Sequence, residues 1–291
     1  MKEVLVLSGK GGTGKTCIVA SLASLAKSKV MVDCDVDAAD LYLLLKTGTQ
    51  ESCEFWSGQK AVIDRDRCTE CGLCLEVCRF KAITDKFQVD PISCEGCCFC
   101  YNVCPVDAVM MEDSLSGHWF ISQTRYGSLV HARLGVAQEN SGRLVALVRQ
   151  KAKLIAEEQD VDYIISDGPP GIGCPVISSL SGVDLAVIIT EPTLAGMHDL
   201  DRVIGVCHHF TVPVIVGINK YDINEGNSQQ IESYCQAQGI EVAAKVPFDN
   251  VVTEALVQGL PVVEYSQSKV TCEIERLWQV VTKHLSAETT K

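Results

Sequence analysis

The sequence predicts an α/β protein whose core is a doubly wound, mostly parallel sheet, with a small α+β domain inserted into it. Three observations support this prediction. A strand pattern, a glycine-rich turn and an apolar helix pattern follow one another within residues 3–27. Further apolar strand patterns between residues 161 and 219 alternate with helical ones, as in repeated βαβ units. Residues 68–104 hold a regular run of cysteines that interrupts this alternation.

The totals exclude several classes of protein. The chain has 291 residues, a net charge of −12 and 47% hydrophobic residues, which is enough for one large domain and one small one. The acidic charge argues against nucleic-acid binding, and no apolar run approaches membrane-spanning length. We therefore expect a cytoplasmic protein without membrane insertion. In that compartment the 16 cysteines favour metal ligation over disulfides.

The first motif is a Gly-x4-Gly-Lys-Thr sequence, which begins at Gly9 and ends at Thr16. Residues 3–8 predict a buried strand before it, and residues 16–27 predict a helix after it. Such a junction directs backbone N–H groups and the positive end of a helix dipole toward an anion. We expect Lys15 to reach the terminal phosphates and Thr16 to bind Mg²⁺; a glycine-rich turn without ligand is the alternative. The predicted nucleotide-binding residues here are Gly9, Gly11, Gly12, Thr13, Gly14, Lys15 and Thr16.

Lys10 is a second lysine within this loop, in the sequence Gly-Lys-Gly-Gly-Thr-Gly-Lys-Thr. The loop resembles the deviant phosphate-binding loop of the MinD/ParA/Mrp-type ATPases, which include the nitrogenase iron protein. The resemblance implies binding of ATP or ADP with Mg²⁺. It also implies a nucleotide-dependent homodimer or paralogous heterodimer, in which Lys10 reaches the partner's nucleotide. A solvated loop lysine is the alternative.

Carboxylates follow two predicted strands. The strand at residues 29–33 precedes Asp35 and a helix predicted at residues 38–45. The strand at residues 161–167 ends in Asp167 before a Gly-Pro turn. In the resembled family, the residue at Asp35 orients the attacking water or a Mg²⁺-bound water. Asp167 would hold Mg²⁺ through water, and the region of Gly171 would respond to loss of the γ-phosphate. The roles of Asp37 and Asp40 are interpreted as helix capping or surface charge, whereas that of Asp33 is left open.

The cysteine run is an internal duplication. Its spacing is Cys-x2-Cys-x2-Cys-x3-Cys, starting at Cys68 and repeated 26 residues later from Cys94. The run resembles the bacterial two-cluster ferredoxins, in which the fourth cysteine of each half serves the other cluster. One [4Fe–4S] cluster is therefore assigned to Cys68, Cys71, Cys74 and Cys104. The other is assigned to Cys94, Cys97, Cys100 and Cys78.

Two departures from the ferredoxin pattern stand out. Arg79 follows the fourth cysteine of the first half, where the second half has Pro105, and Cys98 occupies a position that is usually glycine. Cys98 is interpreted as a thiol outside the ligand set, although it leaves the ligand choice at Cys97 open and could allow cluster rearrangement. Two structural zinc sites are the competing interpretation. The expected domains are ATPase residues 1–56 and 114–291, with a ferredoxin insertion at 57–113.

The base-binding side holds an ambiguity. Residues 219–222 spell Asn-Lys-x-Asp, a guanine-reading signature of GTPases, whereas the resembled family uses Asn219 for adenine. Pro247 and Asp249 resemble the second base-side loop of that family, so ATP is preferred over GTP. Cys174 is interpreted as a buried structural thiol. The helix at residues 268–285 is expected to pack on the ATPase body.

Three functions agree with these patterns. The first is an ATPase that couples nucleotide state to electron transfer through two [4Fe–4S] clusters. The second is an Mrp-like carrier that assembles or delivers iron–sulfur clusters, although the carriers' Cys-Pro-x-Cys is absent. The third is a spatial organiser like MinD or ParA. The first is preferred, with a redox or iron–sulfur client protein as partner.

Overall fold

The structure is a computed structural model that describes residues 1–48, 50–135 and 140–287. It divides into two compact units. The first holds Met1–Ser52, Trp119–Arg133 and Ser141–Lys291; the second holds Cys53–His118 and Leu134–Asn140, of which residues 136–139 lie outside the described residues. The end of the predicted third segment, residues 288–291, also lies outside them.

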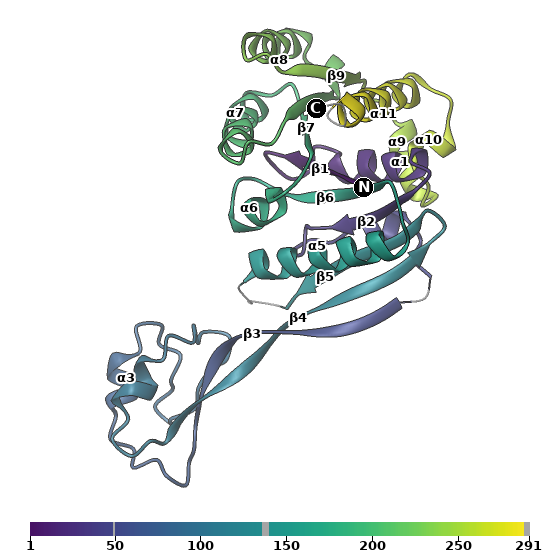
Figure 1. The fold of residues 1–291 in the computed structure, drawn as a ribbon. Coiled ribbons are helices and arrows are strands. Elements are labelled where there is room, and N and C mark those ends of the chain that lie inside the picture. The colour runs from purple at the N-terminus through teal and green to yellow at the C-terminus, as the bar shows by residue number, and fades with distance from the viewer. Residues whose placement is uncertain (49, 136–139, 288–291) are drawn as a thin grey trace. The chain divides into compact units, whose positions relative to one another are not determined.

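The first unit is built on a parallel sheet in the order β5-β2-β6-β1-β7-β8-β9 (Figure 1). All six strand pairs between β5 and β9 in this order are parallel. The predicted mostly parallel, doubly wound sheet is thereby confirmed. The strands are β1 (Lys2–Ser8), β2 (Lys29–Asp33), β5 (Gly127–Leu134), β6 (Tyr163–Pro170), β7 (Leu185–Thr190), β8 (Val214–Asn219) and β9 (Glu241–Val246).

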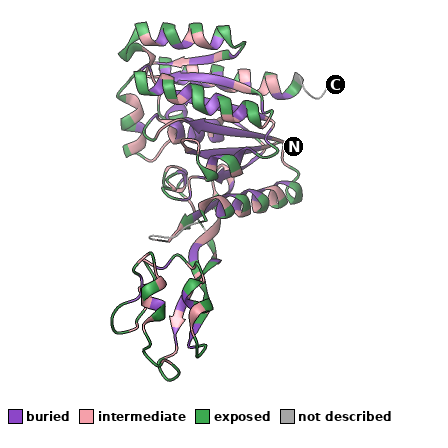
Figure 2. Ribbon diagram, turned by 90° about the vertical axis from the view of Figure 1, so that its left-hand side faces the viewer, coloured by how far each residue is buried: buried purple, intermediate pink, exposed green. Residues whose placement is uncertain are grey.

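Helices cover both faces of this sheet because the central strands are apolar on both sides. In β1, Val4 and Val6 join one core, and Leu5 and Leu7 join the other. Figure 2 shows the central strands of this unit in the purple of buried residues. The first core packs against α1 (Lys15–Leu25), α9 (Val251–Val257), α10 (Val262–Tyr265) and α11 (Lys269–Ala287). The second packs against α6 (Cys174–Leu180), α7 (Leu194–His209) and α8 (Glu225–Ala237). Cys174 itself is exposed at the first turn of α6, so the prediction that its thiol is buried is wrong. The remaining helices are α2 (Leu41–Leu44), α5 (Ser141–Glu158) and the 3₁₀ turn η1 (Tyr221–Ile223).

The C-terminal helix α11 packs against the sheet, as the sequence predicted. Its apolar stripe is buried in the first core. Val270, Leu277 and Val281 are fully buried, and Ile274 and Leu285 nearly so. Because this stripe recurs at helical spacing, the helix uses its apolar face for the core.

Two predicted elements end elsewhere in the structure. Strand β6 continues to Pro170 instead of ending at Asp167, because pairing with β1 persists: Ser8 lies opposite Pro170, and Gly171 N–H donates to the Ser8 carbonyl at 2.9 Å. The helix predicted at 38–45 is shortened to α2. Its Leu41 N–H donates to the Asp33 carboxylate at 3.1 Å, so the preceding loop wraps around that carboxylate.

A buried ion pair ties β1 to α5. Arg149 donates from Nε and Nη2 to the two oxygens of Glu3, at 2.9 and 2.8 Å, and both side chains are at most 6% exposed. Arg149→Met leaves a buried carboxylate without its main partner, so we expect a loss of about 3–5 kcal/mol of unfolding free energy. Lys153→Met is the control, because Lys153 lies 3.4 Å from Glu3 but is 39% exposed. Urea unfolding that gave equal losses for both variants would contradict this account.

The second unit contains α3 (Leu73–Val77), α4 (Phe99–Val103), most of β3 (Gln50–Ile63) and the first part of β4 (Val109–Thr124). The two short helices are separated by the same 26 residues as the cysteine repeat. The halves also exchange hydrogen bonds. Asp64 N–H donates to the Ala108 carbonyl at 2.8 Å, and Asp90 N–H donates to the Ala82 carbonyl at 2.7 Å. These pairs are related by the repeat, so the duplication is structural as well as sequential.

Candidate nucleotide site and cysteine cavities

The loop between β1 and α1 has the backbone that the glycine motif predicts. Gly12 and Gly14 have φ angles of 80° and 84°, which side chains with a Cβ rarely adopt. A Cβ on Gly9 would lie 2.3 Å from the Cβ of Asp199, so only glycine fits there without a shift. Thr13 Oγ1 is buried and has no partner within the described residues. This loop therefore offers backbone N–H groups and an unpaired hydroxyl beside the start of α1.

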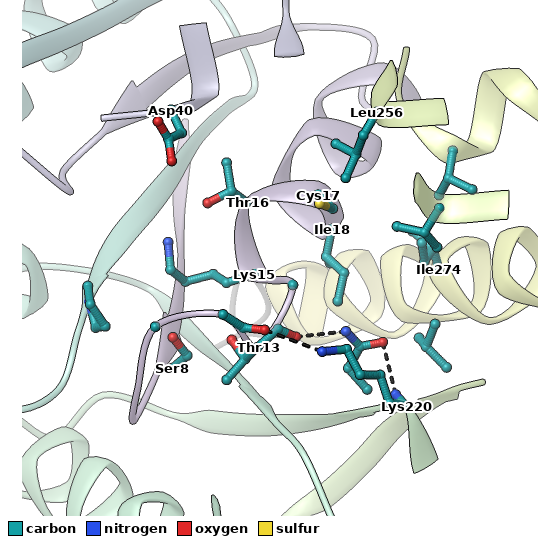
Figure 3. A pocket seen from close by; sticks show the side chains of 18 of the residues that line it. Ser8, Thr13, Lys15, Thr16, Cys17, Ile18, Asp40, Lys220, Leu256 and Ile274 are labelled. Carbon is teal, nitrogen blue, oxygen red and sulfur yellow. Dashed lines mark hydrogen bonds between the residues drawn. The ribbon is translucent and has the colours of Figure 1, made fainter. Parts of the chain in front are cut away.

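A cavity of about 710 Å³ opens at this loop, at the carboxyl ends of the central strands. Figure 3 shows Lys15 and Thr16 at the start of α1, with Asp40 across from them. The predicted residues that line it are Gly11, Gly12, Thr13, Gly14, Lys15, Thr16, Asp35, Asn219, Pro247 and Asp249. Gly9, Lys10, Asp167 and Gly171 are not part of this lining. The cavity lies at the carboxyl ends of the strands, where open α/β sheets bind their ligands.

Lys15 and Asp167 form a buried ion pair, from Lys15 Nζ to Asp167 Oδ1. Burial alone would lower the pKa of Lys15, but the Asp167 carboxylate outweighs burial and raises it. Asp33 lies opposite Asp167 in the register of β2 and β6. Burial, together with the Asp167 charge, raises the pKa of Asp33 well above its usual range. One lysine and two carboxyl groups thus lie close together beneath the glycine loop. The lysine is suited to binding phosphate oxygens and the carboxylates to binding a metal cation.

The role of Asp33, which the sequence left open, is structural. Its carboxylate accepts from the N–H groups of Asp35 and Leu41, at 3.0 and 3.1 Å. Asp40 occupies the N-cap position of α2, is exposed and makes no side-chain cap hydrogen bond, so of the two predicted roles it has that of a surface charge. Asp37 is exposed and lines the cavity.

Asp35 lies at the cavity edge. Burial raises its pKa to about 6, while Lys15 opposes the rise. Since the folded pKa exceeds the unfolded value of about 3.9, the folded chain binds this proton more tightly, and stability falls as the pH rises from about 4 through about 6. We expect Asp35→Asn to remove this loss. Without nucleotide or Mg²⁺, its thermal midpoint should exceed that of the wild type at pH 7.5 and approach it near pH 4.

Asp37→Asn is the control for this pH dependence, because Asp37 is exposed on the same loop. A midpoint difference between Asp35→Asn and the wild type that stayed constant from pH 4 to pH 7.5 would contradict the assignment.

Lys10 is held by an acidic residue that the sequence did not single out. Lys10 Nζ lies 3.1 Å from Glu191 Oε2 and 3.5 Å from Thr193 Oγ1. Lys220 Nζ lies 2.6 Å from the other oxygen of Glu191 and 3.3 Å from the Gly12 carbonyl. Burial works against the charge of Glu191, but the two lysines outweigh it and lower the pKa of this carboxyl. No short motif joins these positions, so only the fold reveals the contact.

The base-side residues separate into two groups. Asn219 Nδ2 donates to the Thr13 carbonyl at 2.7 Å, which fixes the side chain against the glycine loop. Asp222 accepts from Phe248 N–H at 2.7 Å and is not part of the cavity lining. A guanine-reading carboxylate would have to face the base. Here that carboxylate instead secures the loop that carries Pro247 and Asp249, so the geometry favours adenine.

The second unit contains two cavities lined by cysteines. One is lined by Cys68, Cys71 and Cys74 of the first half and by Cys104 of the second. The other is lined by Cys94, Cys97 and Cys100 of the second half and by Cys78 of the first, with Cys98 beside them. Four thiols per cavity match the donor set of a [4Fe–4S] cluster. The crossed sets are those assigned from the ferredoxin resemblance.

Backbone N–H groups point at the crossing sulfurs. Ala82 N–H donates to Cys78 Sγ at 3.4 Å, and Ala108 N–H donates to Cys104 Sγ at 3.2 Å. Such bonds stabilise thiolates and tune the potential of a bound cluster. Within the described residues, no three His, Cys, Asp or Glu side chains are arranged to hold a single metal ion.

A family model of the CobQ/CobB/MinD/ParA nucleotide-binding domain matches residues 4–262. The chain belongs to this family. Members of the MinD/ParA group are P-loop ATPases, so this chain is an ATPase, and the MinD/ParA part of the predicted resemblance is confirmed. The match includes the glycine loop, the strand ends and the base-side loop described above.

Known proteins support the same placement. An uncharacterized protein of Methanocaldococcus jannaschii is 33% identical over 280 residues, which is 95% of both chains. An iron-sulfur cluster carrier protein of Pyrococcus horikoshii is 23% identical over 285 residues, covering 91% of this chain and 80% of the carrier. The structure of the septum site-determining protein MinD of Pyrococcus horikoshii, complexed with Mg-ADP, has a TM-score of 0.59 at 20% identity, covering 100% of this chain and 99% of that one. The last likeness establishes the fold.

Among the residues that the structure describes, no helix is long and apolar enough to cross a bilayer. The stripe of α11 that would serve a membrane surface is buried in the first core.

Proposed function

We propose that this ATPase carries two [4Fe–4S] clusters and that its nucleotide state controls electron transfer through them. The observation that carries the proposal is the pair of cysteine cavities, each completed by a cysteine from the other half of the repeat. A bound cluster would supply one-electron chemistry. The chain supplies the thiolate ligands, the N–H groups directed at the crossing sulfurs and a site for MgATP in the other unit.

The proposed nucleotide chemistry is positioning and charge stabilisation. The loop N–H groups and Lys15 would hold the phosphates, and Thr16 and Asp167 would hold Mg²⁺, the latter through water. Asp35 lies where it can orient a water molecule at the cavity edge. To bind phosphates, Lys15 must leave its ion pair with Asp167, which frees that carboxylate for the cation.

The dimer role proposed for Lys10 sets a further condition. Lys10 is paired with Glu191 of its own chain at 3.1 Å. To reach the nucleotide of a second chain, it must exchange this carboxylate for phosphate. Lys220, which is bound to the same carboxylate, would keep the charge of Glu191 compensated after Lys10 leaves.

Delivery of clusters to other proteins is the second candidate. The named carrier of Pyrococcus horikoshii favours it, since that protein is similar over 91% of this chain. The two candidates differ in what happens to the clusters. An electron-transfer protein keeps them through many redox cycles, whereas a carrier releases them to an acceptor.

The test is anaerobic reconstitution with iron and sulfide, followed by iron analysis and EPR of the reduced protein. The proposal predicts about eight iron atoms per chain and signals of two reducible clusters. The loaded protein is then incubated with an apo-ferredoxin and MgATP. Retention of the clusters supports electron transfer, and their transfer supports the carrier. Absence of bound iron would refute both.

A further inference from the structure

The two halves of the cysteine repeat share the same unusual backbone. Three pairs of positions, each separated by 26 residues, have left-handed φ angles. The pairs, with their φ angles, are Glu70 (55°) and Gly96 (62°), Gly72 (84°) and Cys98 (63°), and Lys81 (52°) and Asp107 (51°). Gly72 precedes α3, and Cys98 precedes α4, at equivalent cap positions. The halves can therefore be compared residue by residue.

The cap position of the second half holds a cysteine where that of the first half holds glycine. A left-handed backbone costs a residue with a Cβ about 1 kcal/mol, and glycine escapes this cost. A Cβ on Gly72 would meet no neighbouring atom within 4 Å, so the first half has room for a side chain but lacks one. Packing at this position does not require a cysteine, and its backbone conformation disfavours one. We therefore infer that the thiol itself has a role.

The thiol of Cys98 belongs to the cavity of the second cluster. Cys98 lines that cavity together with Cys78, Cys94, Cys97 and Cys100. Its Sγ makes a weak hydrogen bond to the Gly96 carbonyl at 3.4 Å. The second cavity therefore has five thiols, whereas the first has four.

We propose that Cys98 is a reserve ligand that replaces Cys97 at the second cluster, an inference that rests on the proposed cluster binding. Cys97 is exposed, whereas Cys94 and Cys100 are buried, so Cys97 is the ligand with most freedom to leave. In the exchange, the Cys98 thiol gives its proton to solvent and its thiolate binds the iron. The Cys97 thiolate leaves that iron and takes up a proton, so no oxidant or reductant is consumed.

The test uses the repeat as its own control, with iron content and EPR of anaerobically reconstituted protein as readouts. Cys97→Ala is expected to keep both clusters, with about eight iron atoms per chain and an altered EPR line shape for one cluster. Cys71→Ala, the equivalent change beside Gly72, is expected to lose one complete cluster. The double variant Cys97→Ala/Cys98→Ala is expected to behave like Cys71→Ala.

A gain of function completes the test. In the Cys71→Ala background, Gly72→Cys places a thiol at the position equivalent to Cys98, and it is expected to restore the first cluster. Equal cluster loss in Cys97→Ala and Cys71→Ala would overturn the inference, as would failure of Gly72→Cys to restore. Absence of iron from the wild type would instead refute the proposed function. MgATP binding by each variant confirms that the first unit is folded, and the cluster that each single variant retains confirms that the second unit is folded.

Discussion

Replacing Lys15 with alanine is expected to weaken MgATP binding by about 100-fold or more, which corresponds to about 3 kcal/mol of lost charge-assisted hydrogen bonding. Lys15 is buried at the start of α1, lines the cavity and is paired with Asp167. Its removal leaves Asp33 and Asp167 buried beneath the loop without the lysine whose charge opposes theirs. Isothermal titration calorimetry with MgATP measures the loss.

The two-unit organisation supplies the control for this variant. The cysteine cavities are lined only by residues of the second unit, so Lys15→Ala should keep its iron and its visible absorption. Lys27→Ala, near the other end of α1, should bind MgATP as the wild type does. Unchanged MgATP affinity in Lys15→Ala would refute the assignment of the nucleotide site. Loss of iron from this variant would refute the expectation that the second unit binds its clusters without Lys15.

Pairs of cysteine substitutions are expected to show that each cluster takes its fourth ligand from the other half of the repeat. Cys74 and Cys104 line one cavity, and Cys78 lines the other. The double variant Cys74→Ala/Cys104→Ala therefore damages one cluster and should retain about four iron atoms per chain, whereas Cys74→Ala/Cys78→Ala damages both and should retain almost none.

The comparison is matched, since each variant lacks two cysteines and shares the change at Cys74. Iron analysis and EPR after reconstitution give the readout. If each half of the repeat instead bound its own cluster, the outcomes would be reversed. Such a reversal would contradict the crossed assignment while leaving two clusters in place.

Local patterns predicted the parts of the fold that neighbouring residues determine. The glycine loop, β1 and the start of α1 follow from one continuous segment. The cysteine repeat likewise predicted the residues that line each cavity, because spacing alone places three thiols together. The assignment of bound clusters and switch roles remains a prediction.

Contacts between distant segments could not be predicted in this way. Glu191 binds both Lys10 and Lys220, although the three residues come from different loops. The Asp222 carboxylate matches a base-reading motif, yet it accepts from Phe248 because tertiary packing brings that loop to it. In both cases the partner lies on a distant segment of the chain, so the fold determines the contact.

The most direct measurement of the central proposal is an anaerobic redox titration of the clusters by EPR, with and without MgATP. If ATP binds one redox state tenfold more tightly, linkage requires a potential shift of about 59 mV for a one-electron couple. The account predicts a shift with MgATP in the wild type and none in Lys15→Ala. Identical potentials in the wild type with and without saturating MgATP would contradict it.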